Sequence, residues 1–94
     1  MKKKESAIQK SILNYLNSLP RCYAVNNHGS AWQGAGRPDI FACCRGQFLA
    51  LEVKTEDGNL TKLQHHELRK WKAAGAKAGV VRSVEDVKKL LKAR

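Results

Sequence analysis

The chain has 94 residues, of which 43% are hydrophobic and 28% are charged, and its formal net charge at pH 7 is +10. That hydrophobic content excludes an intrinsically disordered chain, and the length corresponds to a single small domain over residues 1–94. No apolar run is long enough to span a membrane, and the basic N-terminus lacks the apolar segment of a secretion signal. We therefore expect a soluble protein of the cytoplasm.

The charge is the strongest constraint that composition places on function. Eighteen Lys and Arg residues outweigh eight Asp and Glu residues, and such an excess is typical of proteins that bind a polyanion. Nucleic acid is favoured over an anionic membrane, because no predicted helix combines a basic face with bulky membrane-seeking side chains. A basic protein without such a partner is the alternative that composition leaves open.

The three cysteines are Cys22, Cys43 and Cys44. Their number is odd, two of them are adjacent within a predicted strand, and no C-x-x-C spacing occurs. We expect all three to be reduced and to act as small apolar packing residues in a reducing compartment. A zinc site is disfavoured, because the histidines have no ligand-like spacing to the cysteines.

The first predicted element is a helix over residues 4–19, which ends before Pro20. Its apolar residues recur at helical spacing and form one stripe. They are Ile8, Ile12, Leu16 and Leu19. Glu5 lies on the centre line of that stripe, where a carboxylate is unusual. Two explanations stay open: Glu5 stabilises the helix through the macrodipole, or it reaches across the edge of the core to a functional site.

A short strand is expected over residues 21–27, followed by a loop over residues 28–37 that contains three glycines. Glycines allow the backbone to approach a ligand closely, and exposed amides there suit a phosphate, although the loop has no Walker signature. Trp32 either stacks on a base or closes the core, and we favour the core. Gly36 and Arg37 are the loop residues that we expect to contact nucleic acid, since an arginine suits a phosphate.

The next two strands form a predicted hairpin, which determines where two acidic residues lie. Apolar runs of strand length flank residues 45 and 46, an Arg-Gly turn signal. Counting outward from a two-residue turn pairs Asp39 with Glu52. Residues paired in this way share a face of the sheet, with Cβ atoms about 5 Å apart. Lys54, two residues beyond Glu52, projects from the same face.

Two carboxylates about 5 Å apart repel each other by about 3 kcal/mol at an effective dielectric constant near 20. A divalent cation between them removes this repulsion, and their hard oxygen ligands suit Mg²⁺. A lysine beside such an ion orients a water or stabilises charge on a phosphate. In the structural alternative, Asp39 ends a turn while Glu52 and Lys54 form an exposed ion pair. We favour the metal site, because all three side chains share one face.

A second helix opens at Thr61, where T-x-x-Q over residues 61–64 predicts a capping box. Gln64 also lies on the apolar face of this helix, so it is expected to contact the predicted site from the side. The opposite face is basic, and it is either simply solvated or grips a DNA backbone. Its residues are Lys62, His65, His66, Arg69, Lys70 and Lys72.

Gly75 is expected to end the second helix. A short strand over residues 78–81 and a last helix capped by Ser83 complete the chain. The element order is α-β-β-β-α-β-α, which predicts one layered α/β domain with a mixed central sheet and helices on both sides.

These ordered motifs resemble the PD-(D/E)xK nuclease superfamily, and within it the chain is similar to the stand-alone VRR-NUC domains of bacteriophages. The resemblance spans nearly the whole chain and implies a restriction-endonuclease-like fold. The matching segments are residues 36–40, 52–54, 60–64 and 81–82. One departure is Ser83, which takes the place of the second arginine in the family's Val-Arg-Arg signature.

The resemblance implies an endonuclease that depends on Mg²⁺, or on Mn²⁺ in its place, and that uses no small-molecule cofactor. The implied metal ligands are Asp39, Glu52, Glu5 and the Val53 carbonyl. Lys54 would position the attacking water or stabilise the transition state. Gln64 matches the family's glutamine on the helix after the core strands.

Minimal VRR-NUC domains resemble Holliday-junction resolvases, which implies a homodimer. Symmetric cutting of a four-way junction needs two sites related by a twofold axis, and an isologous dimer supplies them. We therefore expect a structure-specific endonuclease that acts on branched DNA in repair and recombination. The alternatives are a nuclease without branch preference and a non-catalytic basic module that binds nucleic acid.

Overall fold

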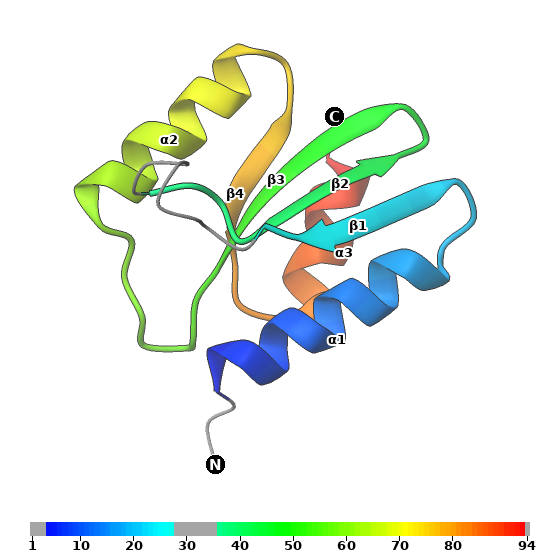
Figure 1. The fold of residues 1–94 in the computed structure, drawn as a ribbon, viewed down its shortest axis with the longest axis horizontal. Helices are drawn as coiled ribbons and strands as arrows, with labels where there is room; N and C mark the ends of the chain where they lie inside the picture. The colour runs from blue at the N-terminus through cyan, green and yellow to red at the C-terminus, as the bar shows by residue number, and fades with distance from the viewer. Residues whose placement is uncertain (1–3, 28–35, 94) are drawn as a thin grey trace.

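The computed structural model describes residues 4–27 and 36–93, and helices and strands follow one another there in the predicted order (Figure 1). The helices are α1 (Glu5–Ser18), α2 (Lys62–Ala73) and α3 (Val84–Lys92). The strands are β1 (Cys22–Asn26), β2 (Ile40–Cys44), β3 (Gln47–Val53) and β4 (Lys77–Val81). None of the helices in these two ranges is long and apolar enough to cross a membrane. Trp32 lies outside the described residues.

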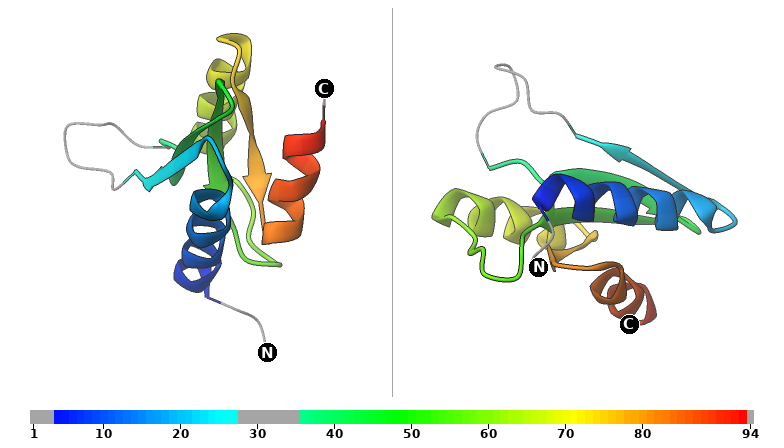
Figure 2. Two further views of the ribbon diagram at one scale, coloured as in Figure 1. Left: turned by 90° about the vertical axis from the view of Figure 1, so that its right-hand side faces the viewer. Right: turned by 90° about the horizontal axis from the view of Figure 1, so that it is seen from below.

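The strands form one four-stranded sheet in the order β1-β2-β3-β4. β1, β2 and β3 pair antiparallel, whereas β3 and β4 pair parallel through the crossover helix α2. The sheet is therefore mixed, as predicted. Figure 2 shows α1 and α3 on one face of the sheet and α2 on the other, so the domain has the expected layered α/β architecture.

The larger hydrophobic cluster lies between the sheet and the pair α1 and α3. α1 contributes the predicted stripe, whose buried members are Ile8, Ile12 and Leu16. Successive residues of a strand point to opposite faces, so Leu49, Leu51 and Val53 of β3 meet this stripe from the sheet. A smaller cluster lies under α2. Its members include Ala50, Leu68, Ala78, Phe41, Phe48 and Trp71.

The helix ends follow the signals in the sequence. Thr61 Oγ1 accepts a hydrogen bond from the Gln64 amide, and Gln64 Oε1 accepts one from the Thr61 amide, so the predicted capping box is present. Ser83 Oγ accepts from the Asp86 amide at the start of α3. Gly75, at φ +107°, follows the last residues of α2, where a left-handed glycine ends a helix readily.

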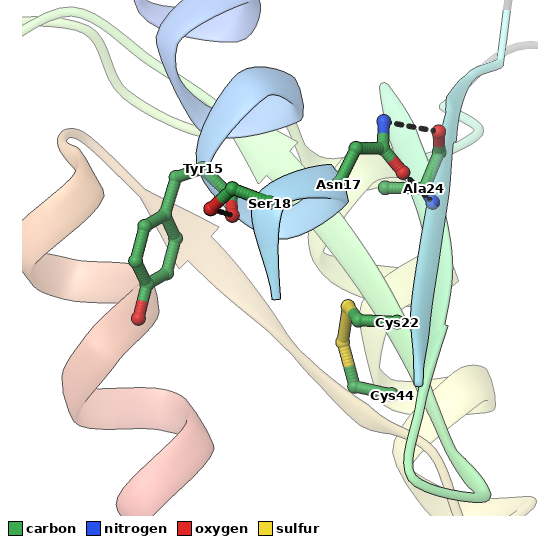
Figure 3. Close-up of a disulfide and its surroundings, with 6 residues drawn as sticks. All are labelled: Tyr15, Asn17, Ser18, Cys22, Ala24 and Cys44. Atoms are coloured by element: carbon green, nitrogen blue, oxygen red, sulfur yellow. Dashed lines mark hydrogen bonds between the residues drawn. A yellow bond between two sulfur atoms is a disulfide. The ribbon is translucent and has the colours of Figure 1, made fainter. Parts of the chain in front are cut away.

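The prediction of three reduced cysteines is wrong for two of them, because Cys22 and Cys44 form a disulfide (Figure 3). The two residues are directly opposite each other on β1 and β2, with Cα atoms 4.1 Å apart. Backbone hydrogen bonds join residue 21 to 45 and residue 27 to 39, so 22 and 44 form a non-hydrogen-bonded pair, in which side chains approach most closely. Cys43 points to the other face and is free and exposed.

The outer edge of β1 is bonded to a side chain of α1. The side chain of Asn17 donates through Nδ2 to the backbone carbonyl of Ala24, and its Oδ1 atom accepts from the backbone N–H of Ala24 (Figure 3). Ala24 belongs to the same non-hydrogen-bonded set as Cys22, so both of its backbone groups point away from β2. Asn17 thus satisfies the backbone groups at the middle of this edge strand.

Candidate active site

The hairpin of β2 and β3 brings Asp39 and Glu52 side by side, as predicted. Ile40 pairs with Leu51, and the next position outward places Asp39 opposite Glu52. The connecting turn has two residues, 45 and 46, with φ of +54° and +83°. A turn of two left-handed residues matches the twist of an antiparallel pair, and it therefore sets the register.

Asp39 is held by hydrogen bonds on both of its sides. Its Oδ2 atom accepts from the Val53 amide at 2.8 Å, so the carboxylate is fixed against the end of β3. Its carbonyl accepts from the Asn27 amide at 2.7 Å, and Asn27 Nδ2 donates to the Pro38 carbonyl. The segment that carries the aspartate therefore has little freedom to move away from β3.

Glu52 is 2% exposed, which makes the alternative of an exposed Glu52–Lys54 ion pair wrong. Burial, followed by the hydrogen bond and the negative charge of Asp39, raises the pKa of Glu52 to about 9. The negative charge of Glu5 acts in the same direction, and the positive charge of Lys54 opposes it. The other three predicted ionisable residues, Asp39, Lys54 and Glu5, therefore all lie within electrostatic reach of Glu52.

The donor set suits a hard divalent cation. Glu52 Oε1 is buried and lacks a hydrogen-bond partner within the described ranges, and burial together with the neighbouring Asp39 raises the pKa of the Glu52 carboxyl group. A cation would supply the missing partner and favour the charged carboxylate. Residues 4–27 and 36–93 contain no group of three His, Cys, Asp or Glu side chains suited to hold a metal. The acidic donors that meet are thus Asp39 and Glu52, and a ligand role for Glu5 stays a prediction.

Gln64 has both of the functions that the sequence left open. Its Oε1 atom completes the capping box of α2, while its Nε2 atom donates to Glu52 Oε2 at 3.3 Å. The cap fixes the side chain in the orientation that this second bond needs. Gln64 therefore orients one oxygen of Glu52 and leaves the other one for a ligand.

Glu67 is a buried acid of this region that sequence reasoning missed. It lies on α2 and is 8% exposed, and its Oε1 accepts from Arg37 Nη1 at 2.8 Å and from Trp71 Nε1 at 3.2 Å. The available signal was its spacing of four residues from Trp71, which places both on one helix face. The ion pair ties the segment before Asp39 to α2.

Gly36 contacts the same helix. It has φ +85°, and a Cβ atom at this position would lie 3.0 Å from the backbone of Leu63. Only glycine fits this conformation and this close approach. Gly36 and Arg37 thus fix the approach to Asp39, and their predicted contacts with nucleic acid stay predictions.

Lys62 and the rest of the predicted basic face of α2 are exposed. Its residues are Lys62, His65, His66, Arg69, Lys70 and Lys72. This face belongs to the same helix as Gln64, whose side chain donates to Glu52. A contact between Lys62 and DNA stays a prediction.

The model of the Hjc family, described as archaeal Holliday junction resolvase, matches residues 1–90 of the chain. A solved structure described as a VRR_NUC domain is 26% identical, with a TM-score of 0.76, over 94% of this chain and 94% of its own. A second, described as a VRR_NUC domain protein, is 18% identical and shows the same fold. Its TM-score is 0.76, over 98% of this chain and 88% of its own.

A comparison with curated proteins found no match. The bacteriophage origin expected from the sequence stays a prediction. The family match covers almost the entire chain, and the fold agrees with that of two VRR_NUC structures. The chain therefore belongs to the archaeal Holliday junction resolvase family and is a nuclease.

Proposed function

We propose that this protein is a Mg²⁺-dependent endonuclease that cuts branched DNA, such as four-way junctions, as a homodimer. The observation that carries the proposal is the pair formed by half-buried Asp39 and buried Glu52, with Lys54 alongside. Burial of an acid beside a second acid costs folding free energy unless a ligand compensates it. Their oxygens are the donors that Mg²⁺ prefers, and Mn²⁺ takes the same ligands.

Asp39, Glu52 and the Val53 carbonyl would hold the cation, and Glu5, whose negative charge contributes to the raised pKa of Glu52, would act as an outer ligand or orient a water. When bound, Mg²⁺ would polarise an oxygen of the DNA phosphate and would lower the pKa of a water molecule that it coordinates. Lys54 places a positive charge beside the carboxylates, where it can stabilise negative charge on the phosphate or orient the attacking water. Gln64 keeps the Glu52 carboxylate in one orientation through its hydrogen bond to Oε2.

The preference for branched DNA is supported by the name of the matched family, archaeal Holliday junction resolvase. Cutting both strands of a junction symmetrically requires two active sites related by a twofold axis, which a homodimer provides. The net charge of +10 and the exposed basic face of α2 suit contacts with the phosphate backbone. Such contacts position the DNA without reading its sequence.

The test is a cleavage assay on synthetic four-way junctions, flaps and linear duplexes, each in Mg²⁺, in Mn²⁺ and in EDTA. We expect paired symmetric cuts in the junction with either metal, none in EDTA, and little cutting of linear duplex. Equal cutting of all substrates would contradict the branch preference. Tight, salt-sensitive binding without cleavage in any metal would contradict the enzymatic assignment.

Dimerisation is tested separately by sedimentation of the protein alone and bound to a junction. We expect twice the mass of the chain. Mixing wild-type protein with an excess of Asp39→Asn protein should then convert paired cuts into single nicks, because most active subunits would have an inactive partner. A monomer that still makes paired cuts would contradict the homodimer.

A further inference from the structure

Arg82 makes a contact that none of the roles described above requires. It follows β4 directly, and its guanidinium Nη1 donates to the carbonyls of Thr55 at 2.7 Å and Gly58 at 2.6 Å. A third carbonyl, that of Glu56, lies 3.4 Å away. One cationic group therefore holds the turn of residues 55–58, which follows Lys54 immediately in the chain.

Arg82 is itself fixed at the backbone. Its amide donates to Asp86 Oδ2 at 2.9 Å, and Asp86 belongs to the first turn of α3, where its own amide is bonded to the Ser83 hydroxyl. The preceding residue, Val81, accepts through its carbonyl from the Lys54 amide at 3.1 Å. The backbone around Arg82 is thus bonded to α3 through Asp86 and to Lys54 through Val81. Neither of these bonds involves residues 55–58, the turn that the Arg82 side chain holds.

The turn, in its own right, packs against the side chain of Lys54. A Cβ atom at Gly58 would lie 3.4 Å from both Cβ and Cδ of Lys54 and 3.2 Å from Thr55 Oγ1. Gly58 therefore lies directly against the lysine stem, and its amide closes the turn on the Thr55 carbonyl at 3.1 Å. A displacement of the turn would remove the surface along which Lys54 extends.

We propose that Arg82 is a positioning residue, which holds the turn of residues 55–58 against Lys54 and so keeps the lysine ammonium beside the carboxylate pair. This inference rests on the proposed function, since it assigns Lys54 a part in cleavage. It also separates the residues of the Val81-Arg82-Ser83 segment by role. Arg82 supports the site, whereas Ser83 caps α3.

The experiment compares Arg82→Ala with Lys89→Ala, which removes one positive charge from an exposed position on α3. Cleavage of a four-way junction is measured in Mg²⁺, and junction affinity is measured in EDTA. We expect Arg82→Ala to lower kcat by about tenfold to a hundredfold, because small displacements of a catalytic group have effects of this size. KM and junction affinity should stay within about twofold, because charge-driven backbone contacts are otherwise retained. Lys89→Ala should leave all three quantities unchanged.

Two further measurements distinguish positioning from general destabilisation. Amide hydrogen exchange at Gly58 should accelerate in Arg82→Ala, while exchange in β3 stays slow. Arg82→Lys should recover most of kcat and slow the exchange at Gly58 again, because an ammonium group also offers several donors to carbonyls. If Arg82→Ala does not unfold cooperatively and is therefore not properly folded, Arg82→Gln is measured in its place. The inference then requires the same loss of kcat in Arg82→Gln.

Wild-type kcat in Arg82→Ala, together with faster exchange at Gly58, would overturn this inference and leave the proposed function intact. Unchanged exchange at Gly58 would also overturn it, since the turn would then be held without Arg82. A wild-type protein that cuts none of the substrates would overturn the proposed function, and this inference with it.

Discussion

The two faces of the sheet differ in how they use buried residues. The face under α1 and α3 is closed by aliphatic side chains, several of which have no exposed surface. The layer between the other face and α2 contains the two buried acids of the described ranges, Glu52 on β3 and Glu67 on α2, beside a smaller aromatic cluster. Burial of aliphatic side chains on the first face stabilises the fold. Burial of acids at the second face costs part of that free energy and holds charged groups in place.

The largest effect should come from the charged face. Asp39→Asn is expected to lower cleavage of a junction at least about a thousandfold, because it removes one of the two acids that would hold the cation. Junction affinity in EDTA should not fall, since the net charge rises from +10 to +11. Glu85→Gln, the same chemical change at an exposed position, is the control. Cleavage by Asp39→Asn at the wild-type rate would contradict the proposed mechanism.

The aliphatic face should dominate folding. Ile12→Ala at a fully buried position is expected to cost about 3–4 kcal/mol of unfolding free energy, through lost burial and the cavity that remains. Leu68→Ala under α2, where 6% of the residue is exposed, should cost about 2 kcal/mol. Urea denaturation in the presence of EDTA measures both. A larger loss for Leu68→Ala would reverse the comparison between the faces.

Metal-free protein should lose stability as the pH rises. The pKa of Glu52 is about 9 in the folded chain and near 4.5 when unfolded, so the folded state keeps a proton that the unfolded state releases. Between these two values the unfolded state is increasingly favoured. At pH 8 in EDTA, Glu52→Gln should therefore be more stable than wild type by about 2 kcal/mol, the cost of a buried group without its partner.

The same difference should shrink towards pH 5, and added Mg²⁺ should stabilise only the wild type. Thermal unfolding across this pH range measures it. Subtracting the curve of Glu52→Gln isolates the contribution of this one group. A difference that does not change with pH would mean that Glu52 titrates normally in the folded protein.

Among the changes near α2, the smallest effect should come from the ion pair between α2 and the segment before Asp39. Glu67→Gln weakens the bond to Arg37, whose side chain is 45% exposed, so we expect a loss of about 1 kcal/mol or less. Glu85→Gln breaks the more exposed pair with Lys88 and should cost still less. Equal losses would mean that burial of Glu67 adds nothing to the pair.

Sequence reasoning was successful where the determinants are local. A two-residue turn and alternating strands set the pairing of Asp39 with Glu52, and T-x-x-Q set the cap that places Gln64. It failed where partners are distant. No short turn relates β1 to β2, so the disulfide could not be derived, and Glu67 pairs with an arginine thirty residues away.

The side chain of Asn17 has a consequence for assembly. An edge strand of a sheet has unpaired backbone groups, with which a strand of another chain can pair. Proteins therefore need features that block such pairing. Here the side-chain amide of Asn17, on α1, makes the two hydrogen bonds to Ala24 that a neighbouring strand would otherwise make. Two copies of the molecule therefore cannot merge their sheets through the centre of this strand. Asn17 thus protects β1 against the edge-to-edge pairing through which sheets aggregate.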